Sequence, residues 1–182
     1  MKKTLFTLIA AFIALPLFSQ EIIHRDSIMQ DASQSLLKSK VIELDSVGQQ
    51  EIKQRIKNWA GQNFVNMNEV LVSETDNQLV FNYIEIYYAK VGNSLIECGE
   101  YTRMIVQIKD GKAKISLYDN GNRADRNIKI TDWFKSNEVL ENKGLHKTSF
   151  YALKDYSTSC KNTLLKLEKS ISNKAEIAME DF

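Results

Sequence analysis

The chain has few of the residues that usually build metal centres, tight turns and redox sites. Its 182 residues include two histidines, two cysteines and one proline, Pro16. Neither His24 nor His146 has a second histidine or a cysteine two or four residues away, so we expect no metal centre and no cofactor. There is no G-x-x-x-x-G-K-S/T phosphate loop and no G-x-S-x-G nucleophile elbow. We therefore expect no catalytic residues, with an unrecognised hydrolase as the enzymatic alternative.

The chain also lacks an excess of charge of either sign. Lysine and arginine number 24, and aspartate and glutamate number 23. A nearly neutral chain has no basic stripe for nucleic acid and no polybasic surface for anionic lipid. We therefore do not expect the chain to bind nucleic acid.

A long apolar run occurs only at the N-terminus, where it has the pattern of an export signal. Lys2 and Lys3 precede an apolar stretch over residues 4–18, which Pro16 interrupts and Ser19 follows. The stretch is shorter than the roughly 20 apolar residues that a membrane-spanning helix needs. We expect a signal peptide over residues 1–19, with an uncleaved anchor as the alternative. The mature chain would be periplasmic or secreted, without membrane insertion.

The remaining chain alternates between β-rich and helical patterns. We expect a polar N-terminal arm over residues 20–38, an α+β domain over 39–134, and a loop with a C-terminal helix over 135–182 packed on the same domain. A helix after Ser46, with Ser46 and Gln49 as its capping box, places its apolar residues on one face through Phe64. A longer helix is predicted over residues 151–179. Strands are predicted at 40–44, 70–72, 78–88, 100–109, 112–118 and within 126–134.

Asp110-Gly111 is a strong hairpin signal, because both residues tolerate positive φ angles. Alternation along this hairpin predicts one face beneath the helices and one free of them. The buried face would carry Thr102, Met104, Val106, Ile108, Ala113, Ile115 and Leu117. The free face would carry Tyr101, Arg103, Gln107, Lys112, Lys114 and Tyr118.

The charge of Glu85 suggests that the odd positions of the strand over residues 78–88 join the free face. Leu79 and Phe81 would then lie there as well. The free face would be rich in aromatic side chains, which is unusual for a surface that only meets solvent. A solvated face, a homodimer interface and a ligand platform are the three interpretations. The candidate binding residues are Tyr83, Glu85, Tyr87, Tyr101, Arg103 and Tyr118.

The two cysteines, Cys98 and Cys160, could form a disulfide bond in an oxidising compartment. Such a bridge would link the C-terminal helix to the sheet. The alternative is two thiols, with Cys160 packed as a small core residue. Spacing alone cannot test the geometry of a bridge.

Part of the sequence resembles a known family. The segment V-I-E-L-D-S-V-G-Q-Q-E-I-K-Q-R-I-K-N-W-A-G-Q-N-F, followed by hairpin strands and Y-T-R-M-I-V-Q-I-K-D-G-K-A-K-I-S-L, is similar to a family of exported Gram-negative bacterial proteins. That family is a domain of unknown function with a TATA-binding-protein-like (TBP-like) fold. The resemblance covers about residues 41–118. It implies a strand, a helix and then a curved antiparallel sheet. Together with the helical patterns, the expected fold is an α+β antiparallel sheet with two helices packed on one face and a long C-terminal helix.

The function expected from these observations is that of an exported, non-enzymatic binding module of the envelope or the exterior. It would use the helix-free sheet face to hold a protein, a peptide or a small ligand. The alternative is a structural or assembly protein that uses the same face as a homodimer interface.

Overall fold

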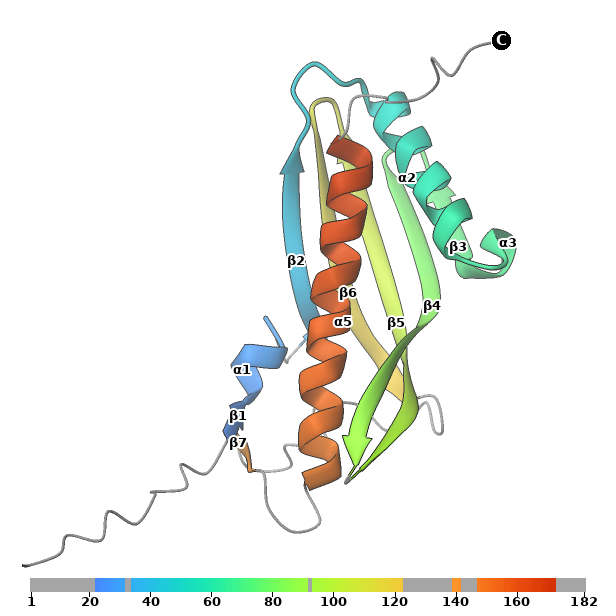
Figure 1. Ribbon diagram of the computed structural model, residues 1–182. Helices are drawn as coiled ribbons and strands as arrows, with labels where there is room; N and C mark the ends of the chain where they lie inside the picture. Colours follow the sequence, from blue (N-terminus) through green and yellow to red (C-terminus); the bar gives the residue numbers. More distant parts are fainter. Residues whose placement is uncertain (1–21, 32–33, 92, 123–138, 142–146, 173–182) are drawn as a thin grey trace, which may run out of the picture.

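The computed structural model describes residues 22–31, 34–91, 93–122, 139–141 and 147–172 (Figure 1). Several expectations lie outside these residues. They are the signal peptide, the strand within residues 126–134, His146, and the part of the C-terminal helix after residue 172.

The fold is a five-stranded antiparallel sheet with helices on one of its faces, as expected for an α+β protein (Figure 1). The strand order is β2-β6-β5-β4-β3. The strands are β2 (Leu36–Glu43), β3 (Leu71–Thr75), β4 (Gln78–Val91), β5 (Ser94–Lys109) and β6 (Lys112–Asn122). The connection between β2 and β3 contains α2 (Gln49–Asn63) and the short α3 (Met67–Val70).

The long helix α5 (Lys147–Ser172) runs along the sheet, with α2 beside its C-terminal end (Figure 1). Near the other end of α5, β1 (Ile22–His24) pairs with β7 (Val139–Glu141), and α1 (Arg25–Ile28) follows β1. The predicted C-terminal helix is confirmed within the described residues, and one side of it is buried. Its buried residues include Leu153, Cys160, Leu164, Leu167 and Ile171.

The hairpin between β5 and β6 turns at Asp110-Gly111, as the sequence predicts. Lys109 pairs with Lys112 across the turn. Only Gly111 has a positive φ, of 73°. The turn therefore lacks the two positive φ angles expected for Asp-Gly. A positive φ at the second turn residue alone is the pattern of a type II turn.

Asp110 keeps an ordinary backbone conformation and uses its side chain on a different element. Its Oδ1 accepts a hydrogen bond of 2.8 Å from the backbone N–H of Gln49, the first residue of α2. The expected Ser46 capping box is therefore wrong: Gly48 is the N-cap residue, and Ser46 lies in the preceding turn with φ of 63°. The cap comes from a residue 61 positions along the chain, which a local motif cannot reveal.

Residues 20–38, expected to be a polar arm, contribute to the core. Ile23, Ile28, Met29 and Leu37 are buried. β2 begins at Leu36, four residues before the predicted strand. Scattered apolar residues in this arm therefore pack, although they show no regular period.

Candidate functional site on the helix-free sheet face

The assignment of side chains to the two faces of the β5–β6 hairpin is confirmed. For β4, the prediction that the odd positions lie on the free face is wrong. Tyr83, Glu85 and Tyr87 lie on the helix-covered face, with exposed fractions of 7%, 7% and 4%. Pairing explains this placement, since Tyr83 lies opposite Thr102 and Glu85 lies opposite Glu100 in the antiparallel register. Opposed residues share a face. Three of the six predicted binding residues are therefore interior.

Hydrogen bonds explain why a charged residue can occupy this interior position. Glu85 accepts bonds from the hydroxyls of Ser159 and Thr163 on α5; the two contacts with Thr163 measure 3.1 and 3.2 Å. A buried carboxylate requires such donors. The inference that a charged side chain must face solvent failed because α5 supplies hydroxyl groups to the sheet.

A second set of interior polar contacts lies beside Glu85. The Tyr87 hydroxyl donates to Glu100 over 3.1 Å, and the hydroxyls of Thr102 and Tyr156 lie 2.9 Å apart. Burial, followed by the charge of Glu100, raises the pKa of Tyr87. These tyrosines stay protonated and serve as structural hydrogen-bonding groups between the sheet and α5.

The other three predicted residues, Tyr101, Arg103 and Tyr118, lie on the helix-free face. Arg103 is exposed and lies opposite Tyr118 on β6. Its Nε donates to the Asn82 side chain over 3.0 Å, so β4 helps to orient it. Tyr101 and Tyr118 are half-buried on the same face. This part of the expected surface exists as predicted.

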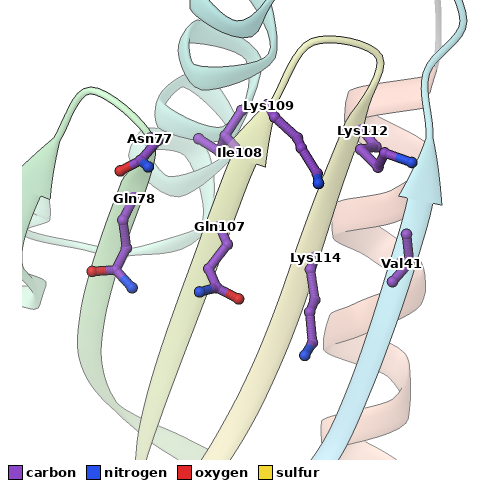
Figure 2. A pocket seen from close by; sticks show the side chains of 8 residues that line it. All are labelled: Val41, Asn77, Gln78, Gln107, Ile108, Lys109, Lys112 and Lys114. Atoms are coloured by element: carbon purple, nitrogen blue, oxygen red, sulfur yellow. The ribbon is translucent and has the colours of Figure 1, made fainter.

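A depression of about 630 Å³ lies on this face, towards the end formed by the β5–β6 turn (Figure 2). Four of its residues form a row across the sheet: Val41 pairs with Lys114, Lys114 with Gln107, and Gln107 with Gln78. Figure 2 shows these side chains along four adjacent strands. The complete lining is Val41, Asn77, Gln78, Gln107, Ile108, Lys109, Lys112 and Lys114.

Three lysines give the depression its electrostatic character. Lys112 is 3.8 Å from Glu43, a distance at the limit of an ion pair. Among the described residues, Lys109 and Lys114 have no ion-pair or hydrogen-bond partner. Two unpaired ammonium groups beside the amides of Gln78 and Gln107 form a surface that can bind an anion. Lysine ammonium groups donate to carboxylate or phosphate, and amides can both donate and accept.

Sequence reasoning found part of this depression. Alternation places Gln107, Lys112 and Lys114 on the free face, but the predicted binding residues are the aromatic positions and their neighbours and do not include these three. The signal was the pattern K-D-G-K-A-K over residues 109–114, which brings three lysines together around one turn. Val41 on β2 and Gln78 on β4 also line the depression. Predicting their place there requires the order of the strands in the sheet, which no local sequence pattern contains.

Cys98 and Cys160 are both thiols in this structure and are not bonded to each other. Cys160 is buried on α5, and this burial raises the pKa of its thiol. Cys98 is half-buried on β5, and its Sγ contacts the Ile96 carbonyl oxygen over 3.7 Å. The disulfide interpretation is therefore not supported.

Within the ranges that the structure describes, no group of three or more His, Cys, Asp or Glu residues is arranged to hold a metal ion. The described helices include none with the length and apolar character needed to cross a membrane.

Two solved structures are similar to this chain in fold. One is a TBP-like protein from Parabacteroides distasonis, with a TM-score of 0.55 and 13% identity over 76% of this chain and 94% of that one. The other is a DUF4468 family protein from Bacteroides ovatus, with a TM-score of 0.55 and 12% identity over 81% of this chain and 99% of that one. No protein-family profile and no curated protein sequence match the chain. Identities this low show the fold alone, and that fold is TBP-like.

Proposed function

We propose that this protein is an exported, non-enzymatic binding module, and that the lysine-lined depression on its helix-free face holds an anionic ligand. The observation that carries the proposal is the pair Lys109 and Lys114, which have no partner among the described residues and line a depression of about 630 Å³. Export rests on the N-terminal pattern of Lys2, Lys3 and the apolar run after them. The two similar folds support a divergent relationship with the exported TBP-like family.

The size and lining of the depression suit a small molecule or a short acidic peptide. Binding sites for small molecules usually measure about 300–1,000 Å³. Val41 supplies apolar surface, while Gln78, Gln107 and Asn77 supply groups that can bind hydroxyl or amide atoms. The lysines would hold a carboxylate or phosphate group. The ligand class is therefore an anion that also carries hydrogen-bonding groups.

Near the β5–β6 turn, the free face carries more cationic than anionic side chains. Arg103 is exposed on the same strand and face as Gln107, four residues before it, and Glu43 is the acidic residue that meets Lys112. Electrostatic attraction of this kind raises the association rate and weakens with added salt. A ligand bound here should show that salt dependence.

The first experiment is native mass spectrometry of residues 20–182 purified gently from the envelope of the host. The expected result is a co-purifying anionic molecule. Titration calorimetry with citrate, inorganic pyrophosphate and a hexaglutamate peptide then measures affinity for defined probes. The double variant Lys109→Ala/Lys114→Ala should lose about tenfold or more in affinity for the probe that binds.

The matched control is Lys161→Ala/Lys169→Ala, which removes two exposed lysines from α5 on the opposite side of the sheet. This control should bind as the unaltered chain does. If both double variants bind the probe equally well, the depression is not the site. If none of the three probes binds and no anion co-purifies, the anion proposal is rejected.

A homodimer is the second candidate, and a different part of the same face favours it. Near the β4–β5 turn, Ile86, Tyr88 and Leu95 have exposed fractions of 40%, 56% and 71%. The register places all three on the helix-free side, because Leu95 lies opposite Lys90. Exposed apolar groups that share a face mark interaction surfaces.

Sedimentation equilibrium over a range of concentrations tests the homodimer. A dimer that dissociates in the variant Tyr88→Lys/Leu95→Lys would support an interface at this end of the sheet. A monomer at the highest concentration would exclude it. The lysine-lined depression lies at the other end of β4 and β5, so the two candidates can be tested separately.

A further inference from the structure

A second, smaller pocket lies on the other side of the sheet, where β4 meets both long helices. Its volume is about 260 Å³. One side of the pocket is formed by α2 and Phe64, the residue after it. The other two sides are formed by β4 and by α5. The lining residues are Trp59, Asn63, Phe64, Tyr83, Glu85, Thr163 and Lys166, together with Ile84 and Ile86, whose side chains point to the other face of β4.

Two buried polar atoms of residues in this pocket have no hydrogen-bond partner. They are the hydroxyl of Tyr83 and the indole Nε1 of Trp59. Tyr83 has an exposed fraction of 7% and Trp59 of 4%. Buried polar atoms are nearly always satisfied, so each exception requires an explanation. Burial, followed by the Glu85 charge, raises the pKa of Tyr83, so its hydroxyl stays protonated beside the Glu85 carboxylate. Both atoms are themselves inaccessible to solvent, so they lie behind the wall of the pocket.

Glu85 supplies a negatively charged hydrogen-bond acceptor in the same pocket. Its carboxylate accepts from Ser159 and Thr163, both neutral, and no lysine or arginine of the described chain lies within ion-pair distance. A carboxylate removed from water favours a cationic partner. Lys166, the cation among the lining residues, is exposed at the rim. The pocket thus has a carboxylate inside and an ammonium group outside.

Aromatic rings form part of the wall. Phe64 lies between the other two rings, with centroids 5.5 Å from Trp59 and 5.1 Å from Tyr83. Aromatic surfaces beside a carboxylate favour ammonium groups through cation–π attraction. The rings also provide apolar surface for an aliphatic or aromatic side chain of a ligand.

We propose that this pocket binds a small zwitterion of the amino-acid class. The ammonium group lies against Glu85 and the aromatic wall, and the carboxylate points towards Lys166. This site lies on the opposite side of the sheet from the lysine-lined depression. It does not depend on the function proposed for that depression.

Trp59 can report binding directly. The chain has two tryptophans, so the variant Trp133→Phe leaves Trp59 as the single source of an indole N–H resonance. The twenty standard L-amino acids are added one at a time, at millimolar concentration, to the ¹⁵N-labelled chain of residues 20–182. We expect at least one to produce a saturable shift of the Trp59 indole proton, because the Trp59 side chain belongs to the pocket wall. The absence of such a shift with all twenty overturns the proposal.

Variants and modified probes test each contact of the amino acid that binds. Glu85→Gln keeps an oxygen that accepts from Ser159 and Thr163 but removes the charge, and should weaken binding about tenfold or more. Lys166→Ala removes the ammonium group at the rim and should weaken binding severalfold, with the amide spectrum of the fold retained. Unchanged affinity in both variants contradicts the assignment.

The N-acetylated form of the same amino acid has no ammonium charge, and the corresponding amine has no carboxylate. Both should bind more weakly than the zwitterion. Equal binding of the N-acetylated form overturns the contact with Glu85, and equal binding of the amine overturns the contact with Lys166. The Lys109→Ala/Lys114→Ala variant should give the same Trp59 shift, which separates this result from the test of the depression.

Discussion

Asp110 connects two elements that are distant in sequence. It is part of the β5–β6 turn, and its carboxylate accepts from the first N–H of α2. The same turn receives further bonds: the Gly111 N–H donates to Val47 over 2.9 Å, and the Leu44 N–H donates to Gly111 over 2.7 Å. One hairpin tip therefore fixes where α2 begins.

We expect Asp110→Ala to lower the free energy of unfolding by about 1 kcal/mol, the usual cost of losing a helix N-cap acceptor. Asp110→Asn retains an acceptor oxygen and should lose less than half as much. Urea denaturation followed by circular dichroism measures both. If alanine and asparagine have the same effect, the hydrogen bond to Gln49 does not stabilise α2.

The two cysteines should differ in reactivity. Burial raises the pKa of the Cys160 thiol, and only the thiolate reacts with alkylating reagents. At pH 8 we expect iodoacetamide to modify Cys98 first and Cys160 only after unfolding. Mass spectrometry of tryptic peptides at successive times measures the order. Resistance of both cysteines in the unfolded, unreduced chain would instead reveal a disulfide bond.

α5 is held to the sheet mainly by its apolar stripe. Leu167 is fully buried, whereas Leu165, two residues before it on the same helix, has an exposed fraction of 45%. Truncating a buried leucine removes apolar contacts and leaves a cavity, while truncating an exposed one changes little.

Leu167→Ala should therefore lower the free energy of unfolding by about 2–5 kcal/mol, and Leu165→Ala by less than about 0.5 kcal/mol. Chemical denaturation of both variants gives the comparison. Equal effects would show that α5 is not docked through this stripe.

Glu74 links β3 to α2. Its carboxylate lies 2.9 Å from the Lys53 ammonium and 3.0 Å from that of Lys57. Hydrogen bonds from Lys53 and then Lys57 lower the pKa of Glu74. A lowered folded pKa contributes stability above the unfolded value, and this contribution is lost as pH falls through the folded pKa.

Glu74→Gln should therefore reduce stability slightly at pH 7, on the scale of an exposed ion pair, and have no effect well below about pH 4. Thermal unfolding at both pH values tests this, and added salt should diminish the difference at pH 7. A difference that grew on acidification would contradict the assigned sign.

At the scale of the whole molecule, the sheet separates two kinds of surface. One side carries the helices, the core and the smaller pocket with Glu85. The other carries the lysine-lined depression and, towards the β4–β5 turn, exposed apolar groups. The mature chain would be nearly neutral overall, with 22 basic and 23 acidic residues once Lys2 and Lys3 are removed. Its binding chemistry therefore comes from local arrangement rather than net charge.

Export is tested on the whole chain expressed in a Gram-negative host. We expect the mature protein to begin near Gln20, and intact mass spectrometry of the periplasmic fraction measures this directly. Lys2→Glu/Lys3→Glu removes the positive residues before the apolar run and should cause the precursor to accumulate. A full-length chain in the cytoplasm, with no processed form, would exclude a cleaved signal.

The sequence determined those features for which local chemistry decides. The apolar period of α2, the hairpin at Gly111 and the alternation of Met104, Val106 and Ile108 each follow from backbone geometry and the side chains along one segment. The positions of Tyr101, Arg103 and Tyr118 on the free face follow from the same alternation. These predictions needed no partner strand.

The tertiary structure decided what depends on partners distant in the sequence. Glu85 became interior because Ser159 and Thr163 supply donors from α5, and pairing with β5 places Tyr83 and Tyr87 on its side. The depression exists because four strands place Gln78, Gln107, Lys114 and Val41 in one row. Alternation selects the buried face only where one face is clearly more apolar; on β4 both faces carry apolar and polar side chains, so packing against α5 decides which of them is buried.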